Sequence, residues 1–302
     1  MIVALAAIVL ARAPGAPPDA GEDRDVVIVG AGDIAQCDEL SGAEATAKLL
    51  DAIPGLVFTL GDHAHPNGGA EEFANCYDPT WGRHKERTRP SPGNHDYDTP
   101  GAVGYFGYWG QSAGDPGKGY YSYDAGAWHV VVLNSNCAHV GCEAGSPQEL
   151  WLREDLKAHP ASCTLAYWHH PLFSSGIKPS HALHPEMRPI WQALYEAGAD
   201  LVLNGHEHNY ERFAPQDPDG RPDATRGIRE IVAGVGGRRL HELPVAVSNS
   251  EIHSDDTFGV LKLTLHSRGY DWEFVPVAGS SFKDSGSGTC HGPVEAVSRT
   301  SP

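Results

Sequence analysis

Residues 57–62 constrain the fold more than any other part of the sequence. Apolar and β-forming residues run up to Leu60, Gly61 and Asp62 follow, and a Pro/Asn/Gly-rich turn comes at residues 66–69. This pattern predicts a short buried strand that ends at a glycine. In open α/β sheets, ligands bind beyond the carboxyl ends of the strands. We therefore expect Asp62 to lie at a functional site and to bridge two metal ions.

The surrounding pattern alternates between strands and helices. Residues 25–30 form a Val/Ile run that predicts a strand, and Ser41 with Glu44 has the spacing of a capping box before a helix. Ser146, Pro147 and Glu149 predict the start of a second helix in the same way. This alternation is typical of an α/β sheet.

Two further strands and one amphipathic helix follow. Residues 164–168 and 200–203 read as strands, and between them apolar residues recur at helical spacing up to Gly198. The rest of the chain alternates as half-buried strands do, up to residue 282. We expect one catalytic domain over residues 25–282 and an irregular Ser/Gly-rich tail over residues 283–302.

Charge and composition narrow the function. The 302-residue chain has a formal net charge of −17, with 40% hydrophobic and 20% charged residues. These proportions are ordinary for a globular protein with a sizeable core. The negative charge argues against nucleic-acid binding through a broad basic face.

The N-terminus resembles an export signal. Residues 2–10 are apolar but too few to span a bilayer, and Ala11, Arg12 and Ala13 resemble a cleavage site. No positive charge precedes the apolar run, so a short apolar tail or a misplaced start codon is the alternative. We expect residues 1–24 to be a signal peptide and linker, no transmembrane anchor, and a secreted or cell-envelope location.

The six cysteines fit an exported chain. An even count suggests disulfides, and six cysteines allow 15 full pairings. Loop length and position favour three pairs, with six reduced thiols in a cytoplasmic enzyme as the alternative: Cys137 with Cys142, Cys37 with Cys76, and Cys163 with Cys290.

Polar side chains of metal-ligand type follow five predicted strands or turns. A lone Asp after Gly is usually a turn or cap residue, and a lone His is usually structural, but the conjunction indicates a site. Oxygen and imidazole ligands without thiolates suit iron, manganese or zinc. The residues are Asp33; Asp62 and His65; Asn94 and His95; His169; and His206 and His208.

These motifs resemble those of the calcineurin-like metallophosphoesterases, and within them the purple acid phosphatase branch. Each short motif is weak alone, but five occur in the family's order over about residues 25 to 212. The matching stretches are Gly32-Asp33, Gly61-Asp62, Gly93-Asn94-His95-Asp96, Trp168-His169-His170-Pro171 and the run from Gly205 to Arg212.

The resemblance implies a four-layer α/β/β/α sandwich of two mixed sheets flanked by helices. It also implies two metal ions, Fe, Zn or Mn, and a role for His95 as electrostatic stabiliser or proton donor, oriented or charged by Asp96. The first ion would take Asp33, Asp62, His65 and His208, and the second would share Asp62 and take Asn94, His169 and His206.

The sequence departs from the family pattern at two positions. Many relatives have a histidine ligand where this chain has Ala35, and the purple branch has a tyrosine where this chain has His65. We expect His65 to replace the tyrosine, with His63 as the rival. An iron form would then lack the purple tyrosinate colour.

Three further residues are candidates for substrate binding. His181 and His184 lie in a loop that often lines the family's substrate pocket, although a solvated loop is the alternative. Arg212 could contact the substrate phosphate or form a structural ion pair.

The leading hypothesis is a dinuclear metal-dependent hydrolase of small phosphate monoesters that acts best at mildly acidic pH. A hydroxide that bridges the metals would be the nucleophile. One alternative is a phosphodiesterase on nucleotide or lipid head-group diesters. The other, a non-catalytic metal-binding module, is disfavoured because a scaffold has no use for His95.

Overall fold

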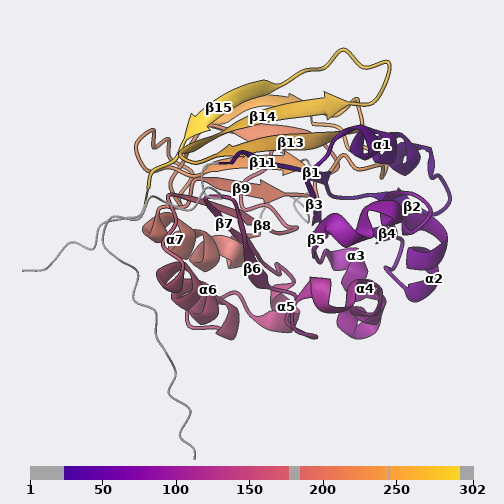
Figure 1. Ribbon diagram of the computed structural model, residues 1–302, viewed down its shortest axis with the longest axis horizontal. Helices are drawn as coiled ribbons and strands as arrows, with labels where there is room; N and C mark the ends of the chain where they lie inside the picture. Colours follow the sequence, from indigo (N-terminus) through magenta and orange to yellow (C-terminus); the bar gives the residue numbers. More distant parts are fainter. Residues whose placement is uncertain (1–23, 177–183, 244, 293–302) are drawn as a thin grey trace, which may run out of the picture.

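The computed structural model describes residues 24–176, 184–243 and 245–292 (Figure 1). Two large mixed sheets dominate it. The first sheet has six strands in the order β15 (Ser285–Thr289), β14 (Gly269–Pro276), β13 (Gly259–His266), β1 (Val26–Ala31), β3 (Leu56–Leu60) and β5 (Thr88–Ser91).

The second sheet has seven strands. Their order is β12 (Ser250–Ser254), β10 (Tyr210–Phe213), β11 (Arg229–Ala233), β9 (Leu201–Asn204), β8 (Cys163–Tyr167), β7 (Trp128–Val132) and β6 (Tyr121–Ala125). A two-stranded ribbon joins β2 (Ala35–Gln36) to β4 (Ala64–His65).

The α-helices are α1 (Ser41–Ala52), α2 (Ala70–Glu72), α3 (Asn94–Asp98), α4 (Val103–Trp109), α5 (Cys137–Val140), α6 (Pro147–Ala158) and α7 (Arg188–Ala197). Short 3₁₀ or π segments lie at Phe73–Tyr77, Trp81–Arg87, Pro100–Ala102, Gly110–Ala113 and Pro185–Met187.

The sheets share one hydrophobic core. Strand residues that alternate along β7, β8 and β9 point to opposite faces, as the pleat requires. One set, which includes Leu165 and Leu203, joins the core of the first sheet with Ile28 and Leu263. The other set, which includes Ala166 and Val202, packs against α6 and α7 through residues such as Leu152 and Ile190. The mixed α/β fold with two sheets is therefore confirmed.

Parallel strands bring several loops to one edge. β1, β3 and β5 run parallel to one another, and so do β7, β8, β9 and β11. Their carboxyl ends consequently meet at the same edge of each sheet. The candidate site lies there.

The two helix starts differ from expectation in detail. Ser41 is the first residue of α1 rather than its cap, and its backbone N–H donates to Oε1 of Glu39 at 3.2 Å. The predicted Ser41/Glu44 capping box is therefore wrong. At α6, Oγ of Ser146 accepts from the backbone N of Glu149 at 3.3 Å, whereas the Glu149 carboxylate turns to Gly145.

The expected irregular tail is wrong at its start, because β15 pairs with β14. Its glycines explain the strand, since they leave room for aromatic rings. A Cβ on Gly286 would lie 2.3 Å from the Trp272 ring, and one on Gly288 would lie 2.4 Å from the Tyr270 ring. Rings that cover glycines in a neighbouring strand stabilise such an edge.

Three disulfides join distant segments, and they are the three pairs expected. Cys37–Cys76 links β2's loop to the Phe73–Tyr77 turn, and Cys137–Cys142 closes a short loop around α5. Cys163–Cys290 joins the chain just after β15 to the start of β8, and so ties the two sheets together.

The expected signal and linker, residues 1–24, lie almost wholly outside the described residues. Within the described part of the chain, no helix has both the length and the apolar character needed to cross a bilayer.

A buried histidine ties α6 to the second sheet. His129 on β7 contacts Asp124 through Nδ1 at 3.0 Å and Asp155 on α6 through Nε2 at 2.8 Å. Burial opposes the charge, but the two carboxylates prevail and raise the pKa of His129. Burial likewise opposes ionisation of Asp155, yet His129 and Ser122 lower its pKa.

The network should make stability depend on pH. Because the folded pKa of His129 is raised, its contribution is full below about pH 6.5 and is lost as the pH rises through the folded value. We expect His129→Gln to lower the free energy of unfolding by about 1 kcal/mol more at pH 5.5 than at pH 9. Urea unfolding at both pH values measures this difference. The exposed His253→Gln is the control, and an equal loss at both pH values would contradict the prediction.

The glycine–ring contact of β15 gives a second test. Gly286→Val should displace the Trp272 ring and destabilise the fold by about 1–3 kcal/mol, as overpacking does. The neighbouring Ser287→Ala, at an exposed position on the same strand, should change stability little. Thermal unfolding of both variants measures this difference. Similar melting temperatures for the two would argue against the packing of the Trp272 ring on Gly286.

Candidate metal centre

Three residues at the ends of strands turn the backbone sharply and bring their side chains into the site. Asp33 (φ 58°), Asp62 (φ 54°) and His206 (φ 68°) each follow a glycine and adopt the left-handed conformation that side-chain-bearing residues rarely take. Such strained residues cluster at functional sites. Each corner turns the chain at the end of β1, β3 or β9, so that its side chain points to a common place.

One group of ligand atoms converges around the side chain of Asn94. Its Oδ1 lies 3.0 Å from Nε2 of His169 and 3.0 Å from Nδ1 of His206, and these two nitrogens are 3.2 Å apart. Oδ2 of Asp62 lies 3.3 Å from Nε2 of His169. Ligands about 2.1 Å from one ion lie about 3.0–3.4 Å apart, so these spacings fit a single cation.

A second group comprises Asp33, His65 and His208, and ligand atoms of Asp33 and His65 also lie close to the Asp62 carboxylate. Oδ1 of Asp33 is 3.3 Å from Nε2 of His208. The ring of His65 lies 6.1 Å from that of His208, and both of its nitrogens are buried without a hydrogen-bond partner in the described structure. Buried polar atoms are almost always paired. The unpaired imidazole of His65 therefore fits a metal ligand.

Backbone carbonyls orient two of the histidines. Nδ1 of His169 donates to the carbonyl of Leu60 at 2.6 Å, and Nδ1 of His208 donates to that of Arg239 at 2.7 Å. Each contact fixes the tautomer and leaves Nε2 free to bind a metal, as outer contacts of ligating histidines usually do. The sequence alone did not indicate the role of Arg239, because a carbonyl has no residue signature.

Glycine allows the ligand loops to approach each other. A Cβ on Gly93 would lie only 2.1 Å from Oδ1 of Asp62. That oxygen accepts from the backbone N of His95 at 2.9 Å, so that Oδ2 is the oxygen that faces the ligand atoms.

Burial and ion pairing shift the pKa values of several side chains in the site. Burial disfavours the charged form of Asp62, but His169 outweighs it and holds the pKa of Asp62 well below its usual value. Burial also opposes the charge on His169, whose pKa Asp62 nevertheless raises to about 9. Burial lowers the pKa of His65 to about 4. His65 is thus neutral over the physiological range, which suits an imidazole ligand.

The rival His63 points away from both groups. Nε2 of His63 contacts Oγ1 of Thr59 at 2.7 Å, and Nδ1 contacts Oδ2 of Asp96 at 3.0 Å. Four aromatic rings surround it with centroids 5.4–5.7 Å away, those of Phe73, Tyr77, Tyr105 and Trp109. The structure gives His63 a packing role.

Asp96 does not orient His95, contrary to expectation. Its Oδ2 accepts from the backbone N of Gly93 at 2.8 Å and of Asp62 at 3.2 Å, in addition to the contact with His63. It thereby locks the two ligand loops together. The first turn of α3 directs its side chain inward because it caps the helix at Gly93.

Asp98 takes the place that we expected for Asp96. Nδ1 of His95 lies 2.9 Å from Oδ2 of Asp98 and 2.6 Å from the carbonyl of Pro66, while Nε2 lies 3.9 Å from Oδ2 of Asp62. The i, i+3 spacing on a helix places His95 and Asp98 on one face. That spacing was the signal that could have identified Asp98.

The three candidates for substrate binding differ in where they lie. His184 lies beside the group around Asn94, with its ring 5.1 Å from that of His206, and its Nδ1 contacts Glu186 at 3.0 Å. Arg212 instead pairs with Asp284 at 2.7 Å and stacks over Trp272. The structural ion pair therefore replaces the suggested phosphate contact for Arg212. His181 lies outside the described residues.

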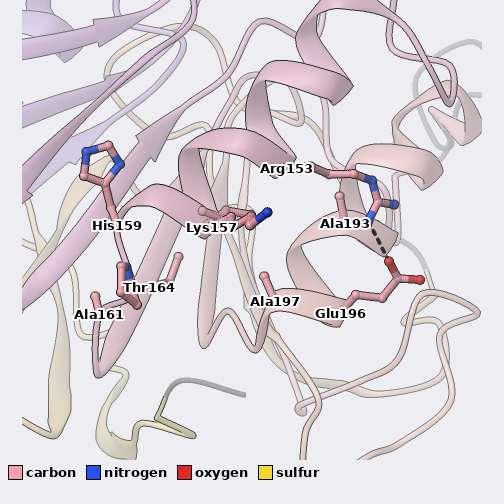
Figure 2. A pocket seen from close by; sticks show the side chains of 10 residues that line it. Arg153, Lys157, His159, Ala161, Thr164, Ala193, Glu196 and Ala197 are labelled. Atoms are coloured by element: carbon pink, nitrogen blue, oxygen red, sulfur yellow. Dashed lines mark hydrogen bonds and ion pairs between the residues drawn. The ribbon is translucent and has the colours of Figure 1, made fainter. Parts of the chain in front are cut away.

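A pocket of about 400 Å³ between α6 and α7 is a separate feature (Figure 2). It is lined by Lys157, Glu196 and Thr164, among others, and Arg153 and Glu196 pair across it at 2.7 Å. Thr164 lies near the start of β8, whereas His169 follows its end. The pocket is therefore at the opposite end of the strand from the metal-ligand groups.

Converging carboxylate, amide and imidazole ligands at the strand ends of two packed sheets define a metallophosphoesterase-type site. The chain belongs to the calcineurin-like phosphoesterase family, which matches residues 15–210.

Individual relatives agree with this family assignment. Purple acid phosphatase 15 of Arabidopsis thaliana is 27% identical over 203 residues, which cover 56% of this chain and 38% of that protein. A nucleotide pyrophosphatase/phosphodiesterase of Hordeum vulgare is 26% identical over 82% of this chain and 78% of its own length. The chain spans about two fifths of the length of purple acid phosphatases 15, 20 and 23 of Arabidopsis thaliana, the second of which is named as probable.

A solved structure shares the fold. The purple acid phosphatase from yellow lupin seeds superposes with a TM-score of 0.66 at 19% identity, over 89% of this chain and 54% of that one.

His65 and His63 should differ in their effect on metal binding. We expect His65→Ala to weaken the binding of one metal equivalent by more than about 10- to 100-fold, the range for loss of an outer contact of a ligand. His63→Ala should keep the metal stoichiometry but lower the free energy of unfolding, because it removes buried contacts. Elemental analysis after dialysis and urea unfolding measure the two effects. Loss of metal from the His63 variant alone would reverse the assignment.

Proposed function

We propose that this chain is a metal-dependent hydrolase of phosphate monoesters with a dinuclear centre. The observation that carries the proposal is the convergence of metal-ligand-type side chains around Asp62, with the ring of His95 among them, 4.5 Å from that of His65. Family membership supports the phosphoesterase class.

The ligand sets follow from the two groups. One ion would be held by Asp33, Asp62, His65 and His208, and the other by Asp62, Asn94, His169 and His206. Iron, zinc and manganese all accept such ligands. Two bound cations supply Lewis acidity, polarise phosphoryl oxygens and lower the pKa of water.

His95 is placed to act on the leaving group. Its Nδ1 is held by Asp98 and the carbonyl of Pro66, so the ring is fixed, and its Nε2 faces the site near Oδ2 of Asp62. At this position Nε2–H can donate to a phosphoryl or leaving-group oxygen. A purely metal-binding module would have no use for this arrangement.

We also propose that the protein is exported to the cell envelope or beyond. Three disulfides suit an oxidising compartment, in agreement with the expected export to the cell envelope or beyond.

Phosphodiesters are the second candidate class of substrate. The barley relative, whose name includes phosphodiesterase, aligns over 82% of this chain, more than the plant phosphatases do. The same ligand groups could serve either ester, because the difference lies in what surrounds them.

Replacement of His95 tests the proposed chemistry. His95→Ala should lower kcat for a nitrophenyl phosphate monoester about 10²- to 10⁴-fold, in the range of lost acid or electrostatic catalysis. Bound metal should not change, because His95 is not one of the proposed ligands. His253→Gln is the matched control on β12. Near-normal turnover in the His95 variant would reject the mechanism, and a higher kcat/KM for bis-nitrophenyl phosphate would favour the diesterase.

A further inference from the structure

A pocket of about 330 Å³ opens directly beside the group of ligand-type side chains around Asn94. Asn94, a member of that group, forms part of its lining, and Tyr97 and Asp98 of α3 continue the same wall. His139 of α5 and Glu186 lie among the other lining residues. The pocket therefore adjoins the place where an ester bound at the metals would carry its alcohol part. We call it the leaving-group pocket.

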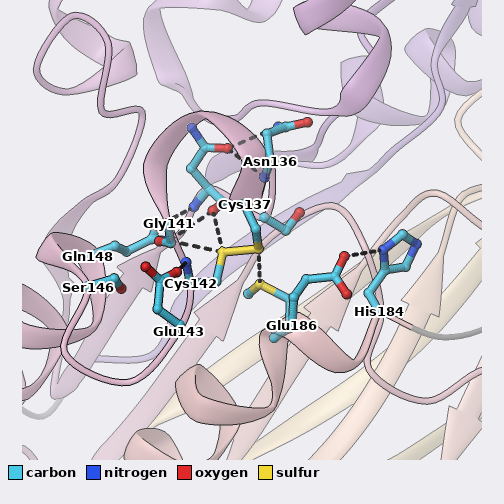
Figure 3. Close-up of a disulfide and its surroundings, with 12 residues drawn as sticks. Asn136, Cys137, Gly141, Cys142, Glu143, Ser146, Gln148, His184 and Glu186 are labelled. Carbon is cyan, nitrogen blue, oxygen red and sulfur yellow. Dashed lines mark hydrogen bonds and ion pairs between the residues drawn. A yellow bond between two sulfur atoms is a disulfide. The ribbon is translucent and has the colours of Figure 1, made fainter.

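The wall formed by α5 is fixed to the metal centre. Nδ2 of Asn136 donates to the carbonyl of Gly93 at 3.3 Å, immediately before Asn94. The Cys137–Cys142 disulfide closes the loop, and Sγ of Cys137 lies 3.6 Å from Sδ of Met187 (Figure 3). The pocket thus has a preformed wall.

The lining of this pocket carries two carboxylates and three histidines, His139, His170 and His184. Asp98 and Glu186 contribute carboxylates whose side chains are 50% and 44% exposed, and no lysine or arginine is among the lining residues that the structure describes. Each carboxylate pairs with a histidine, His95 or His184, and has a second oxygen left to accept. A second phosphate on the substrate would be repelled here, whereas a cation would be attracted.

Two aromatic rings line the same pocket, that of Tyr97 from α3 and that of His139 from α5. The rings of Tyr97 and His139 stack with centroids 4.4 Å apart and an angle of 25° between their planes. The Tyr97 hydroxyl accepts from Nδ2 of Asn134 at 2.8 Å, which holds the ring in place. Aromatic rings with carboxylates nearby are a common means of binding alkylammonium groups.

We propose that the leaving-group pocket selects phosphate esters of cationic amino alcohols, such as a choline-type quaternary ammonium alcohol. The inference rests on the proposed phosphoesterase function and deepens it. It names a substrate class by charge and shape, and it predicts poor use of leaving groups that carry a further phosphate.

An isosteric pair of esters tests the charge selectivity. Phosphocholine and 3,3-dimethylbutyl phosphate have nearly the same shape, but only the first carries a positive charge in its alcohol part. We expect kcat/KM for phosphocholine to exceed that for the neutral isostere about tenfold or more. Glu186→Gln should reduce this ratio several-fold, while Glu273→Gln, which removes a carboxylate from β14, should leave the ratio unchanged.

The outcomes separate this inference from the proposed function. A ratio near one, or a ratio that Glu186→Gln does not change, contradicts the cationic selection even if both esters are hydrolysed. Hydrolysis of neither ester rejects the proposed function instead. Calorimetric binding of the two esters to the metal-loaded protein then decides the inference: tighter binding of phosphocholine supports it, and equal binding overturns it.

Discussion

The site depends on one constraint: Asp62 must turn sharply out of β3 and reach ligands from several other loops. Its left-handed backbone, the close approach of Gly93 and the hydrogen bond from the backbone of His95 together fix one carboxylate oxygen and aim the other. The Asp96 carboxylate accepts hydrogen bonds from the backbone N of Asp62 and of Gly93, and so holds the same two loops together. Because the corner is strained, the surrounding structure must determine it fully. The buried core of two packed sheets provides that support.

The parallel strand ends explain why distant residues meet. His169 follows β8 and His206 follows β9, and these strands are neighbours, so their loops emerge side by side. Asp33 and Asp62 emerge in the same way from β1 and β3. The second sheet faces the first through a shared core, which brings the two pairs of loops together. The fold therefore converts five separated motifs into two groups of ligand atoms.

Sequence reasoning predicted the sheet class and the disulfide pairs, because strand patterns and cysteine spacing are local signals. It chose Asp96 instead of Asp98 as the carboxylate that meets His95, because the i, i+3 spacing of His95 and Asp98 indicates a contact only once α3 is known to be helical there. It also missed β15, whose glycines indicate a flexible tail until Trp272 and Tyr270 are seen to cover them. The choice between His65 and His63 likewise required their three-dimensional surroundings.

Anomalous diffraction from crystals of the metal-loaded protein is the most direct test of the central claim. We predict two anomalous peaks on either side of the Asp62 carboxylate, one near His65 and His208 and the other near His169 and His206. A single peak, or peaks that do not share Asp62, would contradict the dinuclear centre on which this account depends.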